Sequence, residues 1–151
     1  MEFIEKIKKT APDATVSENG EPVVSVSAQE LHQVAEALYA DSEHPMDYLR
    51  DIVGMDWGET GLGALYLLES TRTGHRIILK TVTADREQAF LPTVSDLWKT
   101  ALIKEREVEY FPFFDEGGFP QVGDGRQDGL FAVGCVRIHE NAGAGWCGFS
   151  V

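Results

Sequence analysis

The chain has 151 residues, which is enough for one domain with a sizeable core. Hydrophobic residues make up 43% of it and charged residues 25%, a balance that is typical of globular proteins and excludes general disorder. The formal net charge of −12, with no cluster of lysine and arginine, argues against a nucleic-acid-binding protein. No stretch reaches the ~18–20 consecutive apolar residues that span a bilayer, so we expect no direct membrane insertion. The charged N-terminus also lacks the apolar segment of a signal peptide.

The first segment predicts a helix followed by a β-hairpin. Residues 2–9 place their apolar side chains on one side at helical spacing, and Pro12 ends that pattern. Two short β-prone runs, 15–17 and 23–26, then flank Asn19-Gly20. Because both turn residues tolerate positive φ, this pair is a strong hairpin signal.

A second helix is expected to end near Ala40, before Pro45. From Leu31 onward apolar residues recur at i, i+3, i+4 and i+7, which places them on one face. Ser27 and Glu30 have the spacing of a capping box, in which each side chain would satisfy a free backbone N–H of the first turn.

Three strands and a third helix follow. The strands are expected at 51–57, 62–69 and 75–82, joined by short turns as an antiparallel meander. The third helix is expected at 94–109, with Thr93 and Asp96 capping its first turn. Helices and strands in this order predict an α+β fold: a mainly antiparallel sheet with helices packed on one face.

The composition changes after about residue 110. Residues 111–151 are rich in glycine, contain no lysine and hold both cysteines, Cys135 and Cys147. Since glycine raises the entropy cost of ordering a chain, we divide the protein into an α+β domain at 1–110 and a poorly ordered tail at 111–151. Two cysteines alone do not make a zinc or iron–sulfur site, so free thiols are expected.

One composite pattern resembles a known family. The pattern consists of Pro92-Thr93-Val94-Ser95-Asp96-Leu97-Trp98, Ala101, Glu105-Arg106-Glu107-Val108 and the preceding segments Asp51–Trp57 and Leu65–Leu68. It resembles the C-type subunit of bacterial NADH–quinone oxidoreductase, the thirty-kilodalton subunit of respiratory complex I. The resemblance is good over residues 45–108 and loose before them. After Tyr110 the family's usual His-Pro-Asp and Arg-Arg elements are absent, which leaves its C-terminal docking contacts in question.

The resemblance implies a structural role within an electron-transfer complex. Members of this family are peripheral-arm subunits that carry no cofactor themselves, so NADH, FMN, iron–sulfur clusters and quinone would all belong to partner subunits. The implied partners are the quinone-site subunit and the iron–sulfur subunits. The implied location is the cytoplasmic side of the bacterial inner membrane, where the chain would be held peripherally through the complex and be soluble when isolated.

Glu105 is the most unusual residue of the third helix, because it lies on the same stripe as apolar Ala101 and Val108. A carboxylate on an apolar face needs a partner, which could be backbone N–H groups or an arginine, and Arg50 is the arginine that we would test first. The pairing could lie within the domain or across an interface. The residues that we single out as interface or structural residues are Asp96, Trp98, Glu105, Arg106 and Glu107. We expect no catalytic, cofactor-binding or metal-binding residue.

Three other interpretations stay open at this point. The chain could be the equivalent subunit of a related membrane-bound hydrogenase. It could be a stand-alone α+β binding domain that has lost its complex, as the broken pattern after Val108 would allow. A small hydrolase that uses Cys135 with His139 and Glu140 is the least favoured, because four-residue proximity in a glycine-rich segment is not the geometry of a catalytic triad.

Overall fold

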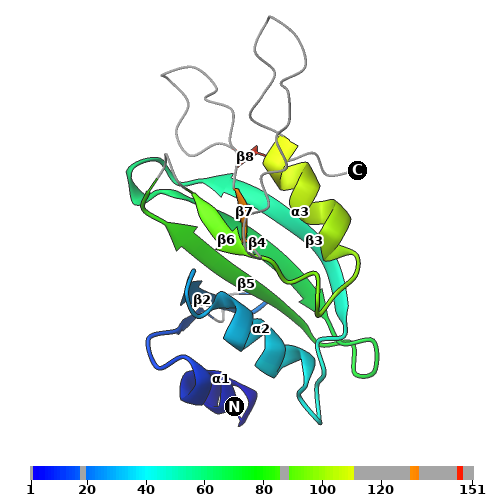
Figure 1. The fold of residues 1–151 in the computed structure, drawn as a ribbon. Coiled ribbons are helices and arrows are strands. Elements are labelled where there is room, and N and C mark those ends of the chain that lie inside the picture. Colours follow the sequence, from blue (N-terminus) through cyan, green and yellow to red (C-terminus); the bar gives the residue numbers. More distant parts are fainter. Residues whose placement is uncertain (1, 18–19, 86–88, 111–129, 133–145, 148–151) are drawn as a thin grey trace, which may run out of the picture.

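The computed structural model describes residues 2–17, 20–85, 89–110, 130–132 and 146–147. Within these residues the helices and strands are, in chain order, α1 (Glu2–Thr10), β1 (Thr15–Ser17), β2 (Val23–Ser27), α2 (Leu31–Tyr39), β3 (Tyr48–Asp56), a 3₁₀ turn (Gly58–Thr60), β4 (Leu62–Glu69), β5 (Arg76–Thr83), β6 (Phe90–Pro92), α3 (Ala101–Tyr110), β7 (Leu130–Ala132) and β8 (Trp146–Cys147). Figure 1 shows one twisted sheet, with α2 and α3 drawn in front of it.

The main sheet has the strand order β1-β2-β5-β4-β3-β8. The meander β3-β4-β5 is antiparallel, as the sequence predicts, and so are the hairpin β1-β2 and the pair β3-β8. Strand β2 runs parallel to β5, which the sequence did not predict. The α+β fold with a mainly antiparallel sheet is therefore confirmed.

One face of the sheet packs against the helices, and we call it the covered face. Its side chains alternate with outward ones along each strand, and neighbours such as Tyr66, Leu79 and Ile52 lie in register across three strands. All three are buried. Helix α2 adds its predicted apolar stripe from Leu31 to Leu38, so the core lies between this face and the helices.

The hairpin before α2 forms as expected, but the capping box does not. Gly20 has a φ of +95°, as the predicted turn requires. Ser27 still belongs to β2, and α2 begins only at Leu31. The Ser27 hydroxyl donates to the side-chain carboxylate of Glu30 at 2.7 Å, and no side chain caps a backbone N–H of the helix. The predicted capping box was wrong because these residues turn the chain from strand to helix.

The third helix is shorter than predicted, because it begins at Ala101 and not at Val94. Residues 93–100 form turns, in which the N–H groups of both Leu97 and Trp98 donate to the carbonyl of Val94. Asp96 does not cap a helix; its carboxylate lies 2.8 Å from His32 Nε2. The helical periodicity of 94–101 was misleading because tertiary hydrogen bonds hold this segment in turns.

Two short strands lie in the predicted tail. Strand β7 pairs with β6 in a second, two-stranded sheet, and β8 pairs with β3 at the edge of the main sheet. Most of the remaining tail, including Cys135, His139 and Glu140, lies outside the described residues, so the division at residue 110 and the free thiols stay predictions.

Candidate functional site

The buried carboxylate of Glu105 organises the segment before α3. Its side chain is fully buried. Oε1 accepts a hydrogen bond from the Val94 N–H at 2.8 Å, and Oε2 accepts one from the Thr93 hydroxyl at 2.7 Å. Charge-assisted hydrogen bonds of this kind offset the cost of removing a carboxylate from water. The expectation that Glu105 would have a partner is therefore confirmed, and among the described residues its donors include one backbone N–H and one hydroxyl.

Arg50 is not the partner of Glu105. Its guanidinium lies 3.5 Å from Glu21 and 3.7 Å from Glu69. Arg76 approaches the same two carboxylates, at 3.8 Å from Glu21 and 3.0 Å from Glu69. The proposed pair with Glu105 was wrong because β3 has an irregularity in its register at Arg50, and the side chain joins this cluster at the end of the sheet.

Tyr66 lies in the same interior as Glu105. Burial, with a smaller contribution from the charge of Glu105, raises the pKa of the Tyr66 phenol well above its ordinary value. The hydroxyl has no hydrogen-bond partner in the part of the chain that the structure describes. A phenol with such a pKa stays protonated at neutral pH, so it does not act as a base there. Tyr66 therefore fills the core beside Glu105 and offers no base at neutral pH.

Trp98 joins three segments of the domain. It is 4% exposed, and its indole Nε1 donates to the Met46 carbonyl at 2.9 Å. Its ring meets Tyr39 of α2 edge-on, with 5.8 Å between the ring centroids. Trp98 therefore fastens the turns before α3 to α2 and to the loop that leads into β3.

Of the residues predicted for the interface, the other three are at the surface. Asp96, Arg106 and Glu107 are exposed. Beside them, Lys104 lies 3.3 Å from both Asp51 and Glu107. Burial alone would lower the pKa of Lys104, but these two carboxylates outweigh it and raise the pKa above its ordinary value. Trp98 and Glu105 thus support the helix from inside, while Asp96, Arg106 and Glu107 are accessible to a partner.

The opposite face of the sheet carries no residue that was singled out from the sequence as an interface residue, and we call it the open face. Helices α2 and α3 pack on the other side (Figure 1). Its apolar side chains are half-buried and come from four adjacent strands: Val23, Val53, Leu65, Leu67, Ile78 and Val82. The apolar run in 62–69 is the signal that could have found it, because such a run is typical of a strand with both faces covered.

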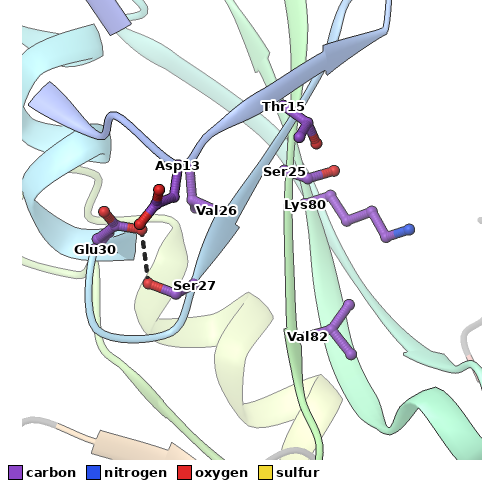
Figure 2. Close-up of a pocket in the computed structure, with 8 residues that line it drawn as sticks. All are labelled: Asp13, Thr15, Ser25, Val26, Ser27, Glu30, Lys80 and Val82. Atoms are coloured by element: carbon purple, nitrogen blue, oxygen red, sulfur yellow. Dashed lines mark hydrogen bonds between the residues drawn. The ribbon is translucent and has the colours of Figure 1, made fainter. Parts of the chain in front are cut away.

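A shallow hollow of about 520 Å³ lies beside this face (Figure 2). Its lining residues are Asp13, Thr15, Ser25, Val26, Ser27, Glu30, Lys80 and Val82. Figure 2 shows the hydrogen bond from Ser27 to Glu30 and, on the other side, Lys80 extending away from Asp13 and Glu30. Its hydroxyl and carboxyl groups do not converge with a nucleophile and base, so we assign it no catalytic chemistry.

The described residues bring no three histidine, cysteine, aspartate or glutamate side chains together as a metal site. Among the helices that the structure describes, none is long and apolar enough to cross a membrane.

Comparison with known proteins shows where similarity is concentrated. The chain is 47% identical over 85 residues to the C/D subunit of NADH-quinone oxidoreductase from Phocaeicola vulgatus, covering 56% of this chain and 16% of that protein. It is 46% identical over 98 residues to the C/D subunit from Bacteroides thetaiotaomicron, covering 58% and 18%. Against the C-type subunit from Erythrobacter litoralis the identity is 32% over 91 residues, covering 59% and 35%. The chain therefore spans only a small part of each of these relatives.

A solved structure has the same fold. It is a chain of the membrane-bound sulfane sulfur reductase, an archaeal respiratory membrane complex, with a TM-score of 0.62 and 24% identity over 80% of this chain and 75% of that one. The family described as "Respiratory-chain NADH dehydrogenase, 30 Kd subunit" matches residues 24–111, more than half of the chain. This range holds nearly all of β2, the strands β3 to β5 and all of α3. The chain therefore belongs to the family of the 30-kilodalton subunit of respiratory-chain NADH dehydrogenase.

Proposed function

We propose that this chain is a cofactor-free, non-catalytic subunit of a respiratory NADH–quinone oxidoreductase. In this role it holds the quinone-site subunit and the iron–sulfur subunits in a fixed relation on the cytoplasmic side of the membrane. The observation that carries the proposal is the family match over residues 24–111, which includes nearly all of β2, the strands β3 to β5 and the Glu105 helix.

A rigid subunit has a physical purpose in such a complex. The rate of electron transfer between two redox centres depends on the distance between them. A subunit that holds its neighbours at a fixed distance therefore helps to maintain that rate. The four contiguous strands β2, β5, β4 and β3 are suited to this task. Glu105 joins α3 to the turns before it, and Trp98 joins those turns to the loop before β3. Because the bacterial relatives are named as C/D subunits, a D-type partner is the first to test.

The equivalent subunit of another membrane-bound respiratory complex is the second candidate. The fold that this chain shares with a chain of the sulfane sulfur reductase, at a TM-score of 0.62, favours it. The two candidates share the scaffold role and differ in the electron donor and acceptor of the whole complex.

Affinity purification of the tagged full-length chain from its own cells, in mild detergent, tests the proposal. We expect other oxidoreductase subunits to co-purify, together with NADH-dependent quinone reduction. Reduction of sulfur compounds or hydrogen turnover in the same preparation, without NADH oxidation, would favour the second candidate. If the chain purifies alone from cells that contain the assembled complex, it is a stand-alone binding domain and both candidates fail.

A further inference from the structure

We infer that the open face of the sheet is a docking surface for a partner polypeptide that presents an apolar surface with a carboxylate opposite Lys80. The inference rests on the proposed function and adds to it the place of contact. It uses a part of the protein that lies on the other side of the sheet from the predicted interface residues of α3.

The open face carries apolar side chains on four adjacent strands, together with Ser25 opposite Lys80 and the charged residues at one end. Antiparallel sheets that face water alternate apolar residues with polar ones. Here Val23, Ile78 and Leu67 form one apolar row across β2, β5 and β4, and Leu65 lies beside Val53 in the next row. Contiguous apolar surface of this kind marks interaction sites.

The charges on the open face define the chemistry of the partner. At one end, Arg50 and Arg76 are both paired with Glu21 and Glu69. Lys80 lies in the row of Leu65 and Val53, with its ammonium 4.7 Å from the centroid of the Trp57 ring. No carboxylate of the described residues pairs with it. A partner that covers this row therefore needs an acidic group at Lys80, because a buried cation without an anion is costly.

The same charges disfavour a second copy of this chain as the occupant. A two-fold dimer pairs the same patch on both molecules. Glu21 and Glu69, the carboxylates at the end of the open face, are already ion-paired with arginines. A dimer would bury Lys80 of each copy in addition. Self-association through this face would thus leave two cations uncompensated, while a partner with an apolar surface and one carboxylate leaves none.

Co-purification with charge-reversed and matched variants tests the inference. In the full-length chain, Lys80→Glu should reduce the yield of partner subunits at least about tenfold, since placing like charges together at an interface costs several kcal/mol. Lys9→Glu, on the exposed side of α1, makes the same charge change and should keep the wild-type yield. Equal thermal unfolding of both variants will show that the domain is intact. An unchanged yield for Lys80→Glu would overturn the inference.

Labelling of Leu65→Cys identifies what covers the face. With the modified site located by mass spectrometry, the cysteine should react quickly with a bulky maleimide in the isolated chain and slowly in the assembled complex. Slow reaction in an isolated monomer means that the chain covers its own face, and slow reaction in an isolated dimer means that a second copy does. Either result contradicts the inference. Protection of Ile103→Cys on α3, with Leu65→Cys still reactive in the complex, also contradicts it while leaving the subunit role intact.

Discussion

Glu105 and Tyr66 are two buried polar groups with opposite surroundings. The carboxylate has its hydrogen bonds to Thr93 and Val94, whereas the phenol has no partner among the described residues. Removing one partner of a buried hydrogen bond leaves the other unsatisfied, whereas removing a hydroxyl that has no partner relieves a cost. The two residues should therefore respond to substitution in opposite directions.

Glu105→Ala should lower the free energy of unfolding by about 1–3 kcal/mol for the backbone and hydroxyl donors that lose their acceptor. Urea denaturation followed by circular dichroism measures it. Glu107→Ala is the matched control, because its side chain is exposed, and it should change stability by no more than about 0.5 kcal/mol. Equal losses from both substitutions would mean that the hydrogen bonds of Glu105 do not support the fold.

Tyr66→Phe should leave the protein as stable at pH 7, or more stable, and should reduce its sensitivity to alkali. The raised pKa of the buried phenol means that the unfolded chain loses the Tyr66 proton first, at about pH 10. The free energy of unfolding is therefore unaffected by this titration below about pH 10. Above that pH it falls, by up to about 1.4 kcal/mol per pH unit. Denaturation curves between about pH 8 and pH 11, on either side of that value, should show a smaller decline for the phenylalanine variant. A parallel decline in both proteins would contradict this.

At the scale of the elements, the close contact between strands β4 and β5 depends on a glycine. A methyl group on Gly63 would overlap the carbonyl oxygen of Thr81 on the neighbouring strand, which is backbone and has little freedom to move. Both strands are central in the sheet that carries the covered and open faces. Close approach of the two backbones is therefore a condition for the register that aligns Tyr66 with Leu79.

Gly63→Ala should destabilise the domain by about 1–3 kcal/mol or more, as overpacking of a well-packed interior does. Gly58→Ala is the control at a position with positive φ but open space around it, and its cost should be about 1–2 kcal/mol. Thermal unfolding of both variants measures the difference. If the Gly63→Ala protein is as stable as the wild type, β4 and β5 can move apart enough to accommodate a methyl group without loss of stability.

At the scale of the whole molecule, the two surfaces that we propose as contact surfaces lie on opposite sides of one sheet. The open face is apolar with Lys80 within it, whereas the α3 side presents Asp96, Arg106 and Glu107. A subunit that holds two neighbours apart needs contact surfaces in two directions. The predicted interface residues of α3 and the inferred docking face are therefore compatible with one scaffold.

The double variant Arg106→Glu/Glu107→Lys should lower co-purification of partner subunits roughly tenfold, a change of about 1.4 kcal/mol, if α3 contacts a partner. The swap leaves the net charge unchanged. Glu5→Lys/Lys8→Glu on α1 is the matched control, since it also exchanges charges between two exposed positions of one helix. Unchanged recovery of the α3 variant would remove Arg106 and Glu107 from the interface and leave Trp98 and Glu105 as internal supports.

The sequence by itself determined the local elements and the family. Alternating or helical spacing of apolar residues and turn residues such as Gly20 locate α1, α2 and the strands β1 to β5 to within a few residues, because these signals act between near neighbours. The stripe that contains Glu105 also showed that this carboxylate would need a partner. The α+β fold follows from the order of these elements.

Only the tertiary structure decided how distant segments meet. The parallel pairing of β2 with β5, the place of Arg50 beside Glu21, and the turns that hold Trp98 all depend on contacts between residues far apart in the chain. Residues 94–100 have helical spacing but do not form a helix, because the Glu105 carboxylate and the Met46 carbonyl accept hydrogen bonds from this segment. The open face, too, exists only once four strands from separate parts of the chain lie in register.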